Sequence, residues 1–175
     1  MEKGLVHIYY GYGKGKSTAA AGLAIRAAAK GLKVLYSTFL KDNTSGEIIA
    51  LKEINNITVY DKESTNGFIF KYDDEKKKEI LSTQKEKFLK LCKIISADDY
   101  DVVILDEVID AVELSCFHYN ELANFIKNKP QKLEIVITGH NFIEGLNELA
   151  DYITEFKCEK HPFNNGVSAR NGIEY

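Results

Sequence analysis

The sequence predicts an α/β fold with a mostly parallel central sheet flanked by helices. Two observations lead to this prediction. Short runs of β-branched and aromatic residues alternate with longer helical stretches along the chain, which is the alternation that builds parallel sheets. Most of the short runs are also continuously apolar, as strands are when helices cover both faces of their sheet.

Six strands and four helices are expected in order along the chain. The strand candidates are residues 5–10 (LVHIYY), 33–40 (KVLYSTFL), 57–60 (ITVY), 101–106 (DVVILD), 133–138 (LEIVIT) and 152–156 (YITEF). The helix candidates are residues 16–30, 74–97, 119–128 and 143–150. In the second helix the apolar residues Ile80, Phe88, Leu91 and Ile95 form one stripe. We expect this stripe to pack on the sheet and the charged opening turn to face solvent.

Length and composition predict a single domain, residues 1–175. The chain has 175 residues, of which 45% are hydrophobic and 28% charged, enough for one sizeable core. Only two prolines, no low-complexity segment and no internal repeat occur. The net charge of −3 provides no basis for general nucleic-acid affinity, so we expect a small partner, with a local basic cradle for an anion.

Cysteine usage and hydropathy predict the compartment. Cys92, Cys116 and Cys158 lie far apart and form no CxxC pair, which suits a reducing cytosol better than a disulfide framework or a zinc site. We find no N-terminal leader pattern and no run of about 18 apolar residues. We therefore expect a cytoplasmic protein with no membrane partner.

A glycine-rich segment at residues 11–18, GYGKGKST, follows the first expected strand and opens the first expected helix. A phosphate-binding loop needs inward-facing backbone N–H groups, glycines where side chains would obstruct, a lysine for charge and a hydroxyl for magnesium. Here Lys16 supplies the charge and Ser17 the Mg²⁺ ligand. We therefore predict a P-loop NTPase-like fold and a nucleotide site. The loop residues assigned to it are Gly11, Tyr12, Gly13, Lys14, Gly15, Lys16, Ser17 and Thr18.

The loop departs from the usual G-x-x-x-x-G-K-[ST] pattern at its first position, where Tyr10 stands. The alternative, a flexible glycine-rich turn, fits poorly with G-K-S-T opening an alanine-rich helix. A partitioning-type ATPase would carry a signature lysine at the position of Gly11, whereas the second lysine here is Lys14. A conventional kinase lid needs arginines, and the chain has only Arg26 and Arg170. The loop by itself selects no reaction.

Two carboxylates end the expected strand at 101–106. Asp106 and Glu107 follow an apolar run, the Walker B arrangement that places acids beside magnesium in phosphoryl chemistry. A polar strand end facing water is the alternative. Given the upstream loop, we assign Mg²⁺ to Ser17, Asp106 and Glu107, with Glu107 as the main acidic ligand. Lys16 and Glu107 are the expected catalytic residues.

Five segments together closely resemble the ATP:corrinoid adenosyltransferases of the BtuR/CobA/CobO type. They are GYGKGKSTAAAGLAIRAAAKG (11–31), KDNTSGE (41–47), DVVILDEV (101–108), IVITGHN (135–141) and EKHPFNNGVSARNGIEY (159–175). The likeness runs from about residue 7 to 175. The C-terminal pattern H-x-F-x-x-G-x-x-A-x-x-G-I-[DE]-[FY] is specific, because a generic NTPase has no reason to carry it.

The resemblance implies a reaction on ribose. In this family a cobalt(I) corrinoid attacks the 5′ carbon of ATP, a cobalt–carbon bond forms and inorganic triphosphate leaves. ATP lies in the loop in the direction opposite to the usual one. The protein must align the 5′ carbon and stabilise the leaving triphosphate, a task for the loop amides, Lys14, Lys16 and magnesium. The resemblance also implies a homodimer and an electron-donating reductase as a partner.

The resemblance assigns further residues to the substrates. Phe68 and Phe70 align with aromatics that displace the lower axial ligand of the corrinoid, although alternate aromatics also suit a buried strand face. Arg26 aligns with a nucleotide contact, although it is equally consistent with an exposed helix face. Lys41 and Glu47 align with a K-G…G-E segment near the active site, and their role stays open.

Some positions depart from the family pattern. Ile109 replaces a small polar residue, and Phe70 stands where family members carry tryptophan. His140 stands where arginine or lysine is common, although it is equally consistent with a surface loop residue. His161 is expected to be a packed or hydrogen-bonded histidine. These departures leave two alternatives to the adenosyltransferase: a P-loop ATPase or nucleotide-dependent switch, and a carrier that holds adenosylcorrinoid without turnover.

Overall fold

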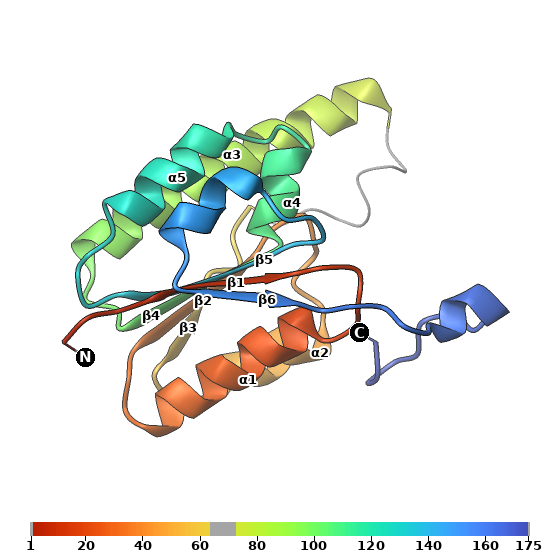
Figure 1. The fold of residues 1–175 in the computed structure, drawn as a ribbon, viewed down its shortest axis with the longest axis horizontal. Helices are drawn as coiled ribbons and strands as arrows, with labels where there is room; N and C mark the ends of the chain where they lie inside the picture. The colour runs from red at the N-terminus through yellow and green to blue at the C-terminus, as the bar shows by residue number, and fades with distance from the viewer. Residues whose placement is uncertain (1, 64–72, 175) are drawn as a thin grey trace.

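The computed structural model describes residues 2–63 and 73–174, and it is an α/β sandwich with a central sheet between two groups of helices (Figure 1). Within the described residues the sheet has six strands in the order β3-β2-β4-β5-β1-β6, and every pairing is parallel. The strands are β1 (Val6–Tyr10), β2 (Val34–Thr38), β3 (Ile57–Val59), β4 (Val102–Asp106), β5 (Glu134–Thr138) and β6 (Tyr152–Glu155). The predicted fold class is confirmed.

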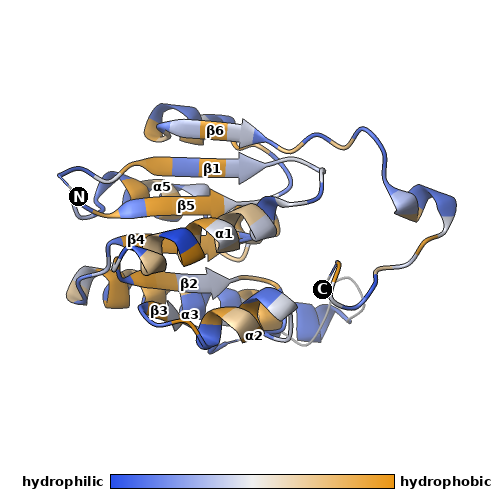
Figure 2. Cartoon of the chain, turned by 90° about the horizontal axis from the view of Figure 1, so that it is seen from below, coloured by the Kyte–Doolittle hydropathy of each residue, from blue (hydrophilic) through white to orange (hydrophobic). Residues whose placement is uncertain are grey.

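Helices cover both faces of the sheet (Figure 1). On one face lie α1 (Lys16–Ala29) and α2 (Gly46–Lys52), and on the other lie α3 (Asp74–Ala97), α4 (Val108–Glu113), α5 (Tyr119–Lys127) and the 3-10 helix η2 (Glu144–Leu149). A second 3-10 helix, η3 (Pro162–Asn165), follows β6 and stands beyond the end of the sheet (Figure 2).

The observed strands and long helices match the predicted ones, whereas the short helices do not. All six predicted strands are present, and the helices predicted at 16–30, 74–97 and 119–128 end within a residue of α1, α3 and α5. The helix expected at 143–150 is the 3-10 helix η2, in which the Tyr119 hydroxyl donates to the carbonyl of Gly145 at 2.7 Å. The sequence reading missed α2 and α4, which have seven and six residues. Helices this short depend on tertiary packing more than on propensity.

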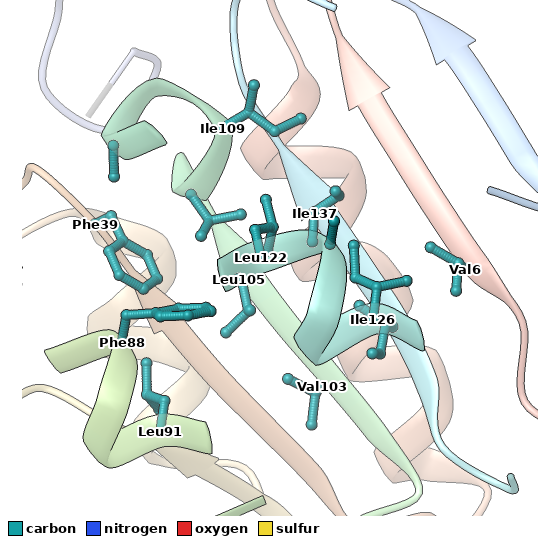
Figure 3. Close-up of a cluster of buried hydrophobic side chains, with 14 of the residues drawn as sticks. Val6, Phe39, Phe88, Leu91, Val103, Leu105, Ile109, Leu122, Ile126 and Ile137 are labelled. Carbon is teal, nitrogen blue, oxygen red and sulfur yellow. The ribbon is translucent and has the colours of Figure 1, made fainter. Parts of the chain in front are cut away.

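Two apolar cores hold the layers together. The larger one lies between the sheet and α3, α4 and α5 (Figure 3). In this core Phe88 of α3 stacks on Phe117 with ring centroids 4.2 Å apart. The predicted α3 stripe is buried, as expected: Phe88, Leu91 and Ile95 belong to this core, and Ile80 is buried as well. On the other face α1 packs through small side chains, Ala20, Ala21, Ala24, Ala27 and Ala28. These small side chains allow the helix axis to lie close to the sheet.

The strand order places three segments side by side at the carboxyl edge of the sheet. Strands β4, β5 and β1 are neighbours, so the glycine loop after β1, the acids ending β4 and the segment after β5 meet there. In open α/β sheets ligands bind at this edge. Within residues 2–63 and 73–174, no helix is long and apolar enough to cross a membrane.

Candidate nucleotide and cation site

The glycine loop between β1 and α1 uses its glycines in two ways. Gly11 and Gly15 have φ values of 110° and 114°, a backbone region that side chains disfavour. A Cβ on Gly13 would lie 2.5 Å from the carbonyl oxygen of Phe156. The loop therefore needs glycine at Gly11 and Gly15 for conformation and at Gly13 for a close backbone approach.

Some of the loop amides are already engaged. The Gly11 amide donates to the His140 carbonyl at 2.9 Å, and the Gly13 amide donates to the Phe156 carbonyl at 2.6 Å. The first N–H groups of a helix have no partner within the helix and attract anions. The amides available for a phosphate are therefore those of residues 14–18, where α1 begins, while Gly11 and Gly13 shape the loop.

The side chain of Lys16 folds back under this loop. Its ammonium donates to the carbonyls of Gly11 at 2.6 Å and Gly13 at 3.3 Å. Burial lowers the pKa of Lys16, while the charges of Asp110 and Glu107 oppose that shift. The ammonium thus lies inside the loop that would surround a phosphate, held by two backbone carbonyls that it can exchange for phosphate oxygens.

The acids at the end of β4 are held by Thr138 of β5. The Thr138 hydroxyl donates to Oδ1 of Asp106 at 2.7 Å and accepts from the Glu107 amide at 2.8 Å. Asp106 is buried, and Glu107 has a φ of 59° at the start of α4. Burial raises the pKa of Glu107, an effect that the neighbouring Lys41 charge opposes. Sequence reasoning missed Thr138, whose only signal was a polar residue ending an apolar strand.

Lys41 brings the three predicted magnesium ligands together around one cation. Its ammonium lies 2.7 Å from Oε1 of Glu107, 3.5 Å from Oδ2 of Asp106 and 3.5 Å from Oγ of Ser17. Burial would lower the pKa of Lys41, but the charges of Asp106 and Glu107 outweigh burial and raise it. The role of Lys41 was open in the sequence; the structure places it at the centre of the site.

These oxygens suit a hard divalent cation. Two carboxylates and a hydroxyl already surround the Lys41 ammonium, so the position accepts positive charge. No group of three or more His, Cys, Asp and Glu side chains with metal-binding geometry occurs among the described residues. Mg²⁺ in phosphate sites needs only one or two carboxylates, because phosphates and water supply its other ligands. The residues therefore fit Mg²⁺.

A third acid, Asp110 on α4, lies close by and was not assigned from the sequence. Its Oδ1 accepts from the His140 backbone amide at 3.0 Å and pairs with Nδ1 of the same histidine at 3.0 Å. Its Oδ2 is buried, and among the described residues it has no hydrogen-bond partner. The hydrogen bond to Asp110 raises the pKa of His140. His140 can therefore carry positive charge where the family pattern has a cation.

Replacing Asp110 with asparagine is expected to lower the pKa of His140, which two-dimensional NMR of the imidazole would measure. The folded-state pKa of His140 lies above its usual 6.5, so the interaction stabilises the fold fully below about pH 6.5 and less as pH rises through the folded value. The Asp110→Asn protein should therefore lose more stability, relative to the native sequence, at about pH 5.5 than at about pH 9. An unchanged His140 titration would contradict this pairing.

The C-terminal segment turns back to the glycine loop. After β6 the chain passes beyond the sheet, forms η3 and turns back (Figure 2). The Glu174 carboxylate lies 3.0 Å from the ammonium of Lys14 and 3.0 Å from the guanidinium of Arg170. His161 accepts from the Phe163 amide at 3.2 Å, so it is hydrogen-bonded, as expected.

The structure does not gather every predicted residue at the site. Arg26 is exposed in the last turn of α1, ten residues and about 15 Å along the helix from Lys16. Ile109 is fully buried, and a Cβ added to Gly139 would lie 2.5 Å from its Cβ, so this departure from the family pattern serves packing. Phe68 and Phe70 lie outside the described residues.

Substituting Gly13 with alanine should damage the loop, and Gly22 offers a matched control. The new Cβ would meet the backbone of Phe156 and Lys157 at 2.5 to 2.8 Å, so we expect a loss of about 1–3 kcal/mol and weaker nucleotide binding. A Cβ on Gly22, within α1, would meet nothing within 4 Å. Gly22→Ala should stabilise the helix by about 0.5–1 kcal/mol. Thermal melts and nucleotide titration compare them; equal melting temperatures would refute the close approach at Gly13.

Comparison with known proteins agrees with these features. The family model described as ATP:corrinoid adenosyltransferase BtuR/CobO/CobP matches residues 2–175. The corrinoid adenosyltransferase of a Sinorhizobium species is 30% identical over 177 residues, which cover 99% of this chain and 81% of the relative. That of Escherichia coli K12 is 29% identical over 174 residues, covering 99% and 87%. The corrinoid adenosyltransferase CobA of Salmonella typhimurium is 29% identical over 175 residues, with the same coverage. The chain therefore belongs to the ATP:corrinoid adenosyltransferase family, whose members are transferases.

Proposed function

We propose that the site at the carboxyl edge of the sheet binds ATP and stabilises its triphosphate while the adenosyl group passes to a corrinoid. One observation carries this proposal. The start of α1, whose free N–H groups can attract an anion, lies beside the oxygens of Ser17, Asp106 and Glu107. The Lys41 ammonium contacts all three side chains. This arrangement suits a departing polyanion, because it offers positive charge and N–H groups to the phosphate oxygens.

The reaction requires positioning more than proton transfer. The corrinoid cobalt(I) donates an electron pair to the 5′ carbon of ATP, a cobalt–carbon bond forms, and the bond from that carbon to the phosphate oxygen breaks. The electron pair of the broken bond leaves on triphosphate. Lys14, Lys16 and the amides of residues 14–18 would bind that triphosphate and hold the 5′ carbon in line.

The residues around Lys41 would hold Mg²⁺ when nucleotide binds. Ser17 and Glu107 are the direct ligands we propose, with Asp106 held by Thr138 behind them. The ion would neutralise charge on the triphosphate oxygens. Oδ2 of Asp110 has no hydrogen-bond partner among the described residues, so it can accept a hydrogen bond from water.

The remaining assignments concern the corrinoid and the partners. We propose that Phe68 and Phe70 contact the corrinoid and that Arg26 contacts nucleotide. We also propose a homodimer and a cytoplasmic reductase that supplies electrons to cobalt. These proposals rest on the resemblance to the family.

The test is a mixture of the protein, Mg²⁺-ATP and chemically reduced cobalamin, kept dark and anaerobic. We expect the visible spectrum of a light-sensitive cobalt–carbon product and one triphosphate released per corrinoid converted. ADP and phosphate with an unchanged corrinoid spectrum would instead indicate the ATPase alternative. Adenosylcorrinoid binding with no turnover would indicate the carrier. Membership of the adenosyltransferase family favours neither the ATPase nor the carrier.

A further inference from the structure

The backbone holds Lys41 beside the acids in a defined position. Strand β2 pairs with β4 so that Thr38 lies opposite Asp106, and the Phe39 amide donates to the Asp106 carbonyl at 2.8 Å. Leu40, the next residue, has a φ of 59°. Its amide donates to the side chain of Gln84, on α3, at 3.1 Å. These bonds fix the turn that directs Lys41 into the site.

The ammonium of Lys41 and a divalent ion need the same oxygens. Lys41 contacts Ser17, Asp106 and Glu107 at 2.7 to 3.5 Å, the distances at which it neutralises the charge that would attract a metal. Two cations a few ångströms apart repel each other strongly away from bulk water. A metal can therefore enter only if the ammonium moves. The Lys41 side chain is 38% exposed, which leaves it room to move aside.

We propose that Lys41 is a tethered cation that occupies the metal position in the nucleotide-free protein and makes divalent-metal binding depend on nucleotide. The inference rests on the proposed function, since it takes Ser17 and Glu107 as the metal ligands. Bound ATP supplies phosphate oxygens both to the metal and to the displaced ammonium. The metal then arrives with ATP and leaves with triphosphate, because the returning ammonium replaces it on Glu107 and Asp106.

The test measures metal binding without turnover. Mn²⁺ replaces Mg²⁺ as the probe, and electron paramagnetic resonance counts free Mn²⁺ in titrations of the nucleotide-free protein. The native protein should bind Mn²⁺ weakly. Lys41→Met should bind Mn²⁺ at least about tenfold more tightly, because one nearby positive charge is gone. Lys41→Gln repeats the test should the methionine variant fold poorly.

Two further variants separate the cation from the rest of the side chain. Lys41→Arg keeps a positive charge and should keep Mn²⁺ binding weak. Lys52→Met removes an ammonium that pairs with Asp61 at 2.7 Å and contacts none of the predicted metal ligands; it should match the native protein. If Lys41 had only a structural role, its substitution would change the stability of the protein, but Mn²⁺ affinity would not rise in Lys41→Met while staying low in Lys41→Arg.

The outcomes distinguish this inference from the proposed function. Unchanged Mn²⁺ affinity in nucleotide-free Lys41→Met and Lys41→Gln would overturn the inference, even if Glu107→Gln weakens Mn²⁺ binding to the ATP-loaded protein. If Glu107→Gln leaves Mn²⁺ binding to the ATP-loaded protein intact, the proposed metal ligands are wrong. Tighter nucleotide-free binding in both Lys41 variants, abolished again by adding Glu107→Gln, supports both.

Discussion

Replacing Lys16 with alanine is expected to reduce adenosyl transfer by about 100- to 1,000-fold, the usual cost of removing one group that stabilises developing negative charge. The ammonium of Lys16 lies inside the glycine loop, where it donates to the carbonyls of Gly11 and Gly13. During transfer, negative charge accumulates on the leaving triphosphate, so the loss should fall mainly on kcat. Stopped-flow spectroscopy of cobalt–carbon bond formation at saturating ATP measures it.

The matched control is Lys30→Ala, which removes an exposed lysine at the other end of α1. It should leave the rate unchanged. Losing the two hydrogen bonds of Lys16 should cost only about 1–2 kcal/mol of stability, so thermal melts of both variants separate misfolding from lost chemistry. Native turnover in a folded Lys16→Ala protein would refute the role of this loop in holding the leaving group.

Glu107→Gln is the second large effect that we expect, with a reduction in kcat of about 100-fold and a higher Mg²⁺ requirement. The substitution keeps the shape of the side chain and removes one of the two negative charges beside Lys41. The Lys41 ammonium is then held less strongly beside the acids, but Mg²⁺ would also lose the acidic ligand that we propose as its main one. Titrating Mg²⁺ at fixed ATP should show partial recovery of activity at high metal concentration.

Glu53→Gln supplies the control, since Glu53 is an exposed acid at the end of α2. Its Mg²⁺ dependence should match that of the native protein. A Glu107→Gln protein with native kcat and native Mg²⁺ dependence would transfer the metal-binding role to another acid. Asp110, whose buried Oδ2 has no hydrogen-bond partner within residues 2–63 and 73–174, would then be the next residue to substitute.

Local patterns in the sequence determined the fold class and predicted the contiguous part of the candidate site. Apolar runs of strand length alternate with long helical stretches, a pattern typical of a parallel sheet covered by helices. The glycine loop is one continuous segment of the chain, so Gly11, Gly15, Lys16 and Ser17 could be predicted as nucleotide-site residues from their spacing alone. The pair Asp106 and Glu107 could be predicted because the two acids lie at the end of one buried strand.

Tertiary structure decided the rest, because those contacts join residues far apart in the chain. Lys41 follows β2, Asp106 ends β4 and Thr138 ends β5; only the strand order β2-β4-β5 brings the three together. No local pattern marks a threonine as the residue that orients Asp106, or Asp110 as the partner of His140. The sequence by itself determined the fold class, the strands and the long helices, and it predicted which loop would bind phosphate. The pairing of parallel strands determined which side chains share the charge of the site, because register and strand order depend on packing between distant segments.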